Sequence, residues 1–118
     1  MPLYTAPLPE PAIGSSTDAI TARSGGGTSL ATVLTSQFNH VTTVAAANDS
    51  VKLPPWAPGV VVHVANDGAN TLAVFPDGGG LDRINSGAAG ASITVASGKT
   101  ASFTGTGSAN RWHGVLSA

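Results

Sequence analysis

The three histidines are the side chains of this chain best suited to chemistry near neutral pH, because imidazole titrates there and binds metals. His40, His63 and His113 stand far apart in the sequence, and no pair has the close spacing of a local metal motif. They would form a site only if the fold or a symmetric oligomer brought them together, for example one histidine per subunit around a threefold axis. A lone histidine on a strand is more often structural, and we favour that interpretation for all three.

Two aspartates flank a glycine-rich segment and raise the question of a calcium site. Asp77 and Asp82 stand on either side of Gly78-Gly79-Gly80. Carboxylates and backbone carbonyls are the ligands that calcium prefers. The spacing of the two aspartates matches no defined calcium loop, however, and aspartate is a common turn residue. We therefore favour turns at both positions and expect no metal or other cofactor.

The sequence lacks a convincing catalytic motif. Ser97-Gly98-Lys99-Thr100 resembles the end of a phosphate-binding loop, but that loop also needs a glycine where this chain has Ile93, and a helix after it. No serine stands in a Gly-x-Ser-x-Gly elbow, and the chain has no cysteine. A small hydrolase or nucleotide-binding enzyme is supported by these weak motifs alone, so we predict that the protein is not an enzyme.

One tryptophan stands where a binding surface would need it. Trp56 lies in the segment Pro54-Pro55-Trp56-Ala57-Pro58, which predicts an exposed loop. An exposed indole either anchors a protein interface or stacks on a sugar. We favour the interface anchor and keep the sugar platform as the alternative, whereas Trp112 is expected in a strand and in the core.

The composition indicates a protein whose surface meets other proteins. Only 9% of the residues are charged, against about 25% in typical globular proteins, and glycine alone occurs 15 times. A charge-poor surface of small residues suggests that much of it faces a partner, although a hydroxyl-rich free surface is the alternative. The net charge of −1 gives no attraction to nucleic acid or anionic lipid, and no apolar run approaches a membrane span or a signal peptide. We expect synthesis in a cytoplasm.

The chain divides into an N-terminal arm and one folded domain. Residues 1–27 are rich in proline, glycine and serine and predict an extended arm with a hinge at its end. Its apolar residues favour an arm that is ordered on a neighbouring subunit over a disordered tail. We predict that five residues contact the capsid or another subunit. They are Leu3, Tyr4, Leu8 and Ile13 in the arm and Trp56 in the proline-rich loop.

Residues 28–118 predict a mainly β domain that begins with a short helix over 28–38. Short β-type runs then alternate with turn residues, which is typical of a small antiparallel β-sandwich or barrel. About seven strands are expected, near 40–46, 50–54, 59–66, 70–76, 92–96, 100–105 and 110–116. The third of these should be central and covered on both faces. Asp67-Gly68 and Ser97-Gly98 predict two hairpins, and a short pairing segment is expected at Arg83-Ile84.

Three segments carry a resemblance to a known class of proteins. Residues 41–54 (VTTVAAANDSVKLP), 59–76 (GVVVHVANDGANTLAVFP) and 95–103 (VASGKTASF), followed by the terminal Trp112, resemble small virion proteins of tailed bacteriophages. Such proteins occur as capsid decoration (cement) subunits and as fibre modules, and they are usually trimeric and β-rich. The resemblance covers about two thirds of the chain, excludes the arm and brings no catalytic residues.

The resemblance implies a capsid decoration protein on the outside of the assembled head. Its expected partners are the major capsid protein and two further copies of itself, with neither nucleic acid nor membrane involved, and its expected location is the capsid surface of the virion. The alternative is a fibre or tail-associated module that binds host-surface glycans through Trp56 and the Gly78 to Gly80 loop.

Overall fold

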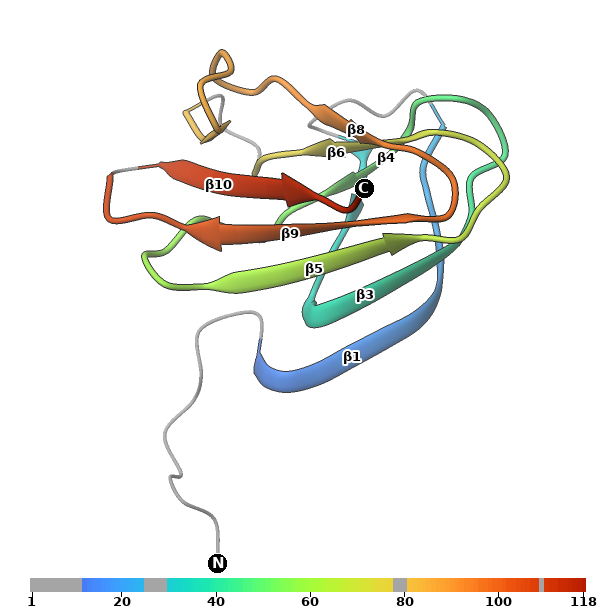
Figure 1. Ribbon diagram of the computed structural model, residues 1–118, viewed down its shortest axis with the longest axis horizontal. Helices are drawn as coiled ribbons and strands as arrows, with labels where there is room; N and C mark the ends of the chain where they lie inside the picture. Colours follow the sequence, from blue (N-terminus) through green and yellow to red (C-terminus); the bar gives the residue numbers. More distant parts are fainter. Residues whose placement is uncertain (1–11, 25–29, 78–80, 109) are drawn as a thin grey trace, which may run out of the picture.

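The computed structural model describes residues 12–24, 30–77, 81–108 and 110–118, and these residues form strands in two sheets (Figure 1). The strands of the described residues are β1 (Ala12–Thr21), β2 (Thr32–Val33), β3 (Ser36–Thr43), β4 (Asp49–Lys52), β5 (Val61–Asn66), β6 (Leu72–Phe75), β7 (Arg83–Ile84), β8 (Ile93–Val95), β9 (Lys99–Gly105) and β10 (Arg111–Leu116). The protein is therefore mainly β, as the sequence predicts.

The chain alternates between the two sheets from β1 to β9. The six-stranded sheet has the order β1-β3-β5-β9-β10-β7, and the four-stranded sheet has the order β2-β4-β6-β8. Successive strands of one sheet are parallel: β1 with β3, β3 with β5, β2 with β4, and β4 with β6. A parallel pair needs a crossover connection, and here the strand of the opposite sheet provides it. The first six strands thus wind in three turns around a common interior.

Antiparallel pairs complete each sheet. β9 pairs in antiparallel fashion with both β5 and β10, and β8 pairs in this way with β6. The two-residue β7 pairs in parallel with the start of β10 and forms one edge of the six-stranded sheet, while β1 forms the other.

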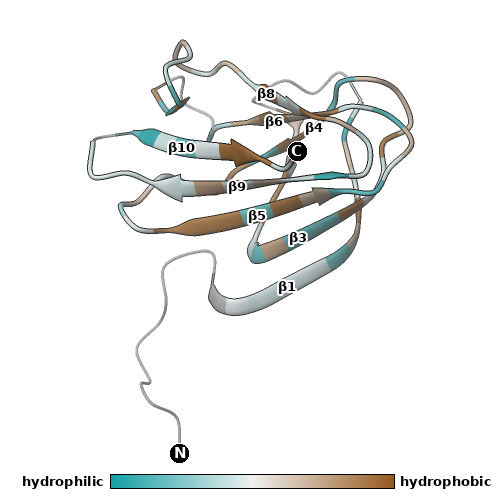
Figure 2. Ribbon diagram, in the orientation of Figure 1, coloured by the Kyte–Doolittle hydropathy of each residue, from teal (hydrophilic) through white to brown (hydrophobic). Residues whose placement is uncertain are grey.

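One apolar core joins the two sheets. Trp112 and Phe103 of the six-stranded sheet are completely buried, as are Val51, Leu72 and Val74 of the four-stranded sheet, and all five belong to the same cluster. Alternate residues of a strand face opposite sides, so Val62 and Val64 face this core while their neighbours face outward. The colouring by hydropathy shows apolar β5 in the middle of the larger sheet and a much paler β1 at its edge (Figure 2).

Several sequence predictions are confirmed. Each of the seven expected strands overlaps an observed one: β3, β4, β5, β6, β8, β9 and β10. The short pairing segment expected at Arg83 and Ile84 is β7. β5 lies between β3 and β9 and is central as predicted, although Val61 and His63 on its second face are only half-buried. Trp112 is in the core.

The predicted pairing of the strands is wrong. The sheets are mixed and not antiparallel, and the two predicted hairpins do not form, because β5 and β6 belong to different sheets, as do β8 and β9. The helix predicted over 28–38 is also wrong over most of its length. Thr32 and Val33 form β2 and pair with Val51 and Lys52 of β4, and β3 begins at Ser36. Thr28 and Ser29 lie outside the described residues.

The second half of the predicted arm is a strand. Residues 12–21 form β1, and Ile20 and Ala22 are buried in the core. Residues 1–11 and 25–27 lie outside the described residues. In the part of the chain that the structure describes, no helix is long and apolar enough to cross a membrane.

Candidate functional site

The most concentrated chemistry of the described residues is an imidazole held between two carboxylates. His40 Nδ1 lies 2.5 Å from Asp18 Oδ1, and His40 Nε2 lies 2.5 Å from Asp67 Oδ2. The three residues come from β1, β3 and the connection after β5, and we call them the His40 clamp. The histidine side chain is 31% exposed, and the aspartate side chains are 76% and 59% exposed.

A bulge in β1 directs Asp18 toward His40. The pairing of β1 with β3 shifts register between Thr17 and Ile20. Ala19 within this interval has a φ of 54°, in the left-handed region that is unfavourable for a residue with a Cβ. Its backbone N–H donates to Asp18 Oδ1 at 2.8 Å. The bulge thus joins local backbone strain to a contact with the clamp.

A buried amide fixes the position of Asp67. Asn66 at the end of β5 is completely buried, and its side-chain NH₂ donates to the carbonyl oxygens of Asn70 and Val95. Its side-chain oxygen accepts from Gly68 N, and the Asp67 N–H donates to Val41 O at 2.8 Å. Because every bond of this network is made, the connection after β5 is held in one conformation.

The clamp shifts the protonation of its members in opposite directions. The hydrogen bond that His40 donates to Asp67, then the one that it donates to Asp18, raises the pKa of His40 above its ordinary value of 6.5. The Ala19 N–H, followed by the hydrogen bond to His40, lowers the pKa of Asp18 below its ordinary value of 3.8. The charged pair is therefore favoured over the neutral pair across mildly acidic pH.

The geometry of the clamp suits fixing the chain better than catalysis. The two carboxylates contact opposite nitrogens of one ring, so they do not converge on a common point where an ion or a reacting atom would sit. Within the described ranges, no group of three or more histidine, cysteine, aspartate or glutamate side chains is arranged to hold a metal ion.

The outer face of the six-stranded sheet is the second notable feature. The strand registers align Phe38, His63, Ser102 and Val115 side by side across β3, β5, β9 and β10. We call these four residues the outer row. Phe38 is 40% exposed and Val115 is 56% exposed. Between them, His63 Nδ1 and Ser102 Oγ form a hydrogen bond of 2.8 Å. The row therefore offers apolar ends and a polar centre whose side chains are hydrogen-bonded to each other.

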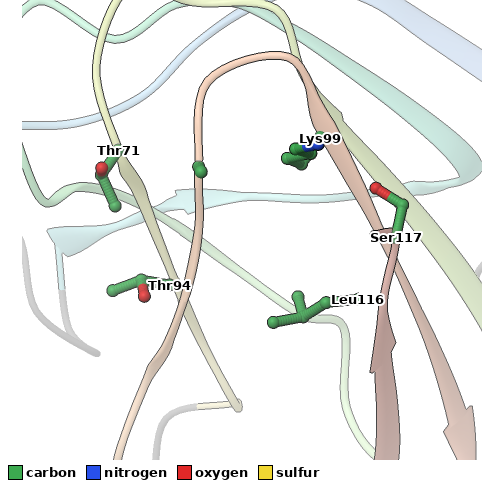
Figure 3. A pocket seen from close by; sticks show the side chains of 6 residues that line it. Thr71, Thr94, Lys99, Leu116 and Ser117 are labelled. Atoms are coloured by element: carbon green, nitrogen blue, oxygen red, sulfur yellow. The ribbon is translucent and has the colours of Figure 1, made fainter.

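A pocket lies beside the ends of β6, β8 and β10. It encloses about 350 Å³. Figure 3 shows the side chains that line it, with three hydroxyl residues around Leu116 and Lys99. Lys99 Nζ donates to the carbonyl oxygen of Ala118, and Ser117 Oγ accepts from Thr100 N, so part of the polar lining is already engaged within the chain. The lining residues are Thr71, Thr94, Ala96, Lys99, Leu116 and Ser117.

Trp56 lies in a loop, as predicted, but is half-buried. Its ring packs against the core, and its Nε1–H donates to Arg111 O at 2.9 Å. The loop crosses the sheet at Gly105, where a Cβ would lie 2.0 Å from Ala57 O, so only glycine fits there. The Trp56 indole therefore helps to attach the loop to β10, and only part of the ring remains for a partner.

The other predicted contact residues lie outside the described structure, either entirely or in their side chains. Leu3, Tyr4 and Leu8 lie outside the described residues. Ile13 belongs to β1, but its side chain lies outside the described part of the structure. Whether these four residues touch a capsid or another subunit stays a prediction.

The remaining candidates for chemistry are separate from one another. His40, His63 and His113 all belong to the six-stranded sheet, yet no hydrogen bond in the described structure joins any two of them. Asp82 is nearly buried. Burial, followed by the charge of Asp77, raises its pKa, while a hydrogen bond from the backbone N–H of Trp56 lowers it. Gly98 has a φ of 79° and forms a tight turn before β9. This segment is therefore a turn and not a phosphate-binding loop followed by a helix.

Sequence reasoning missed the clamp because it depends on unpredicted pairing. His40 was singled out by type, whereas Asp18 and Asp67 were read as ordinary arm and turn residues. Only the parallel register of β1 on β3 brings Asp18 beside His40.

Comparison of the chain with protein-family models, with curated proteins and with solved structures gives no match.

Proposed function

We propose that this chain is a structural protein of a tailed-phage virion, a capsid decoration protein that binds the outside of the assembled head and stabilises contacts between capsomers. In this proposal it acts without catalysis, as a trimer, with the major capsid protein as its other partner. The observation that carries the proposal is the outer row, which has two exposed apolar ends and no Asp, Glu, Lys or Arg. The resemblance of residues 41–54, 59–76 and 95–103 to such proteins gives the class.

The outer row has the properties of a protein contact surface. Protein interfaces are depleted of charge at their centre and rich in aromatic residues. Phe38 supplies the aromatic ring, Val115 supplies the second apolar contact, and the side chains of His63 and Ser102 between them are hydrogen-bonded to each other. Burying such a face on an assembled shell favours the shell over its separated parts.

The arm is the natural second contact in this proposal. Ser16 of β1 pairs with Phe38 of β3, so this N-terminal edge strand lies next to the outer row. Leu3, Tyr4 and Leu8 would then extend the contact beyond the sheet. Repeated attachment by three linked copies lets modest contacts give stable binding.

A capsid-binding assay tests the outer row. Purified protein is added to capsids that lack it, and the bound fraction is compared for the wild type, Phe38→Lys and Val115→Lys, with Ala88→Lys in the exposed loop after β7 as the matched charge control. We expect both outer-row variants to lose binding while Ala88→Lys retains it. Equal binding by all four proteins would assign the contact to another surface, and absence of binding by the wild type would exclude decoration.

The arm needs point substitutions and not a truncation at Thr28, because such a truncation removes β1 and the buried side chains of Ile20 and Ala22. The full chain with Leu3→Ser, Tyr4→Ser and Leu8→Ser is therefore compared with the wild type in the same assay. Weaker binding with an unchanged melting temperature would support the arm as a clamp on the capsid.

The second candidate function is a glycan-binding module of a fibre or tail. For this function the pocket beside β8 is a better site than Trp56, whose ring is half-buried. Hydroxyls of Thr71, Thr94 and Ser117 next to Leu116 offer the mixture of polar and apolar groups that sugars use. Glycan-array binding that is lost in Thr94→Ala, combined with no binding to capsids, would replace decoration by this function. Thr94 is exposed, so its truncation is not expected to unfold the protein.

A further inference from the structure

The hydrogen bonding of the His40 clamp requires a particular protonation state. Both ring nitrogens of His40 contact carboxylate oxygens at 2.5 Å. Ionised carboxylates only accept hydrogen bonds, and a neutral imidazole has one donor and one acceptor nitrogen. Both contacts are made together only when both nitrogens carry a hydrogen, that is, in the imidazolium form. Removing one proton leaves a ring lone pair facing a carboxylate.

We propose that Asp18, His40 and Asp67 form a proton-operated latch that holds the bulge of β1 against the sheet, and that loss of one proton from His40 releases Asp18. The released segment is Asp18 and Ala19, the bulge in the edge strand. This inference does not depend on the proposed function, because it concerns the local stability of β1 whatever the sheet binds.

Asp18 is the partner that leaves, because Asp67 is better fixed. The network of Asn66 and the hydrogen bond from Asp67 N to Val41 O hold the connection after β5 in place. Asp18 lies on the bulge, where Ala19 has an unfavourable positive φ. The larger effect of Asp67 on the protonation of His40 agrees with this order. The remaining proton of the neutral ring therefore stays on Nε2, toward Asp67.

Among the described residues, Asp18 and Asp67 are the charged groups that act on His40. Its partner across the β3–β5 pair is Ala65, and the next residue along this line, on β9, is Thr100. Lys99 pairs with Asn66 and donates its Nζ to Ala118 O.

The opening is local because both flanks of the bulge have other attachments. On one side Ile20 and Ala22 are buried, and Ala22 N donates to Thr43 O at 2.9 Å. On the other side Gly14 N donates to the Gln37 side chain, Gln37 N donates to Ser15 Oγ, and the hydroxyls of Thr17 and Ser36 bond to each other at 2.5 Å. Only the segment between these attachments depends on the charge of His40.

The direction of the pH dependence follows from the two pKa shifts. The pKa of His40 is raised above 6.5, so the stabilisation by its charge is complete below that pH and disappears as the pH rises through the raised pKa. The pKa of Asp18 is lowered below 3.8, so its contribution is present above that pH and disappears as the pH falls further. The latch is therefore closed between the lowered pKa of Asp18 and the raised pKa of His40, and it opens as the pH rises through the pKa of His40.

Hydrogen exchange of single amides tests the latch. The Ala19 N–H donates to Asp18 Oδ1, so its protection factor reports the bulge directly. We expect this factor to fall severalfold between about pH 5.5 and about pH 9, after correction for the intrinsic exchange rate, while that of Val64 in β5 stays constant. NMR titration of the His40 imidazole signals should give the same midpoint.

Two variants separate the latch from general stability. In His40→Arg the side chain stays charged and has donors for both carboxylates, so Ala19 should stay protected at high pH. In His40→Gln the contact with two carboxylates is lost, and Ala19 should exchange rapidly at both pH values. Constant protection of Ala19 in the wild type across the His40 titration would overturn the proposal, as would a fall in His40→Arg equal to that in the wild type.

Discussion

The two edges of the six-stranded sheet are protected in different ways. The β1 edge is long and polar, and its middle depends on the charged His40 clamp. The β7 edge has only two residues, and Ile84 anchors it in the core with 2% of its surface exposed. Exposed strand edges invite unwanted pairing, and a short edge or a bulge discourages it. The sheet uses the bulge at β1 and the short edge at β7.

A side-chain amide holds the β7 edge in place, whereas the charged His40 clamp holds the β1 edge. The Asn85 side chain accepts from Gly114 N at 2.9 Å and donates to Gly114 O at 3.2 Å, so it occupies the position of the next strand residue. An amide does not titrate. The comparison teaches that the β7 edge should keep its structure over a wide pH range, whereas the β1 edge should respond to the protonation of one histidine.

The largest effect is expected at the apolar anchor of the β7 edge. Ile84→Ala removes buried methyl groups that approach Gly114, and such truncations lower the free energy of unfolding by about 2–5 kcal/mol. Denaturant unfolding of this variant should show the loss equally at acidic and alkaline pH. Leu81→Ala, at a side chain that is 69% exposed, is the control and should change stability very little. A small loss in Ile84→Ala would mean that the β7 edge does not rest on the core.

A smaller loss is expected at the amide of the β7 edge. Asn85 has a φ of 56°, so glycine preserves its backbone and removes only the two hydrogen bonds to Gly114. Asn85→Gly should lower the free energy of unfolding by about 1 kcal/mol, and Asn85→Ala by about 1 kcal/mol more, because alanine disfavours the left-handed conformation. Denaturation curves of the two variants at one pH measure both numbers. Equal stability of the two would show that the strain at position 85 is negligible.

The strands of this fold are predictable from the sequence, but their partners are not. Runs such as residues 60–64 are β-branched and bounded by turn residues, which is enough to locate β5. The turn signal at Asp67-Gly68 was misleading because Gly68 serves packing: a Cβ there would lie 2.6 Å from Val44 Cγ2, and its φ is not positive. The chain leaves the sheet at this point and does not turn back. Nothing in the local pattern distinguishes these two outcomes.

The candidate site was harder to predict than the strands. Phe38 falls at the end of the helix predicted over 28–38, yet it lies on the outer face of β3 because Val41 and Asn39 of the same strand face inward and are completely buried. Asp18 was assigned to an arm without periodicity, because the bulge in β1 interrupts the alternation that identifies a strand. The outer row and the clamp both depend on registers between strands distant in sequence, which composition does not encode.

The charge of His40 should appear in the pH dependence of thermal stability. Because its pKa is raised in the folded state, the melting temperature of the wild type should decrease as the pH rises through the region above 6.5. His40→Gln should lower the melting temperature at mildly acidic pH and have little effect at alkaline pH, since the wild type has lost the imidazolium there. Scanning calorimetry over this range measures the difference between the two curves. Parallel curves would place the pH sensitivity of β1 elsewhere.

The smallest effect is expected at Asp82, which tests whether the β7 edge also depends on charge. Asp82 precedes β7, and burial raises its pKa above the ordinary value of 3.8, so wild-type stability decreases as the pH rises from 3.8 through the raised pKa. Asn keeps an oxygen for the Trp56 N–H and carries no charge. Asp82→Asn should therefore raise the melting temperature at neutral pH by at most about 2–4 °C and have no effect below pH 3.8. A decrease at neutral pH would mean that the charged carboxylate stabilises this end of the sheet, and the β7 edge would then also depend on charge.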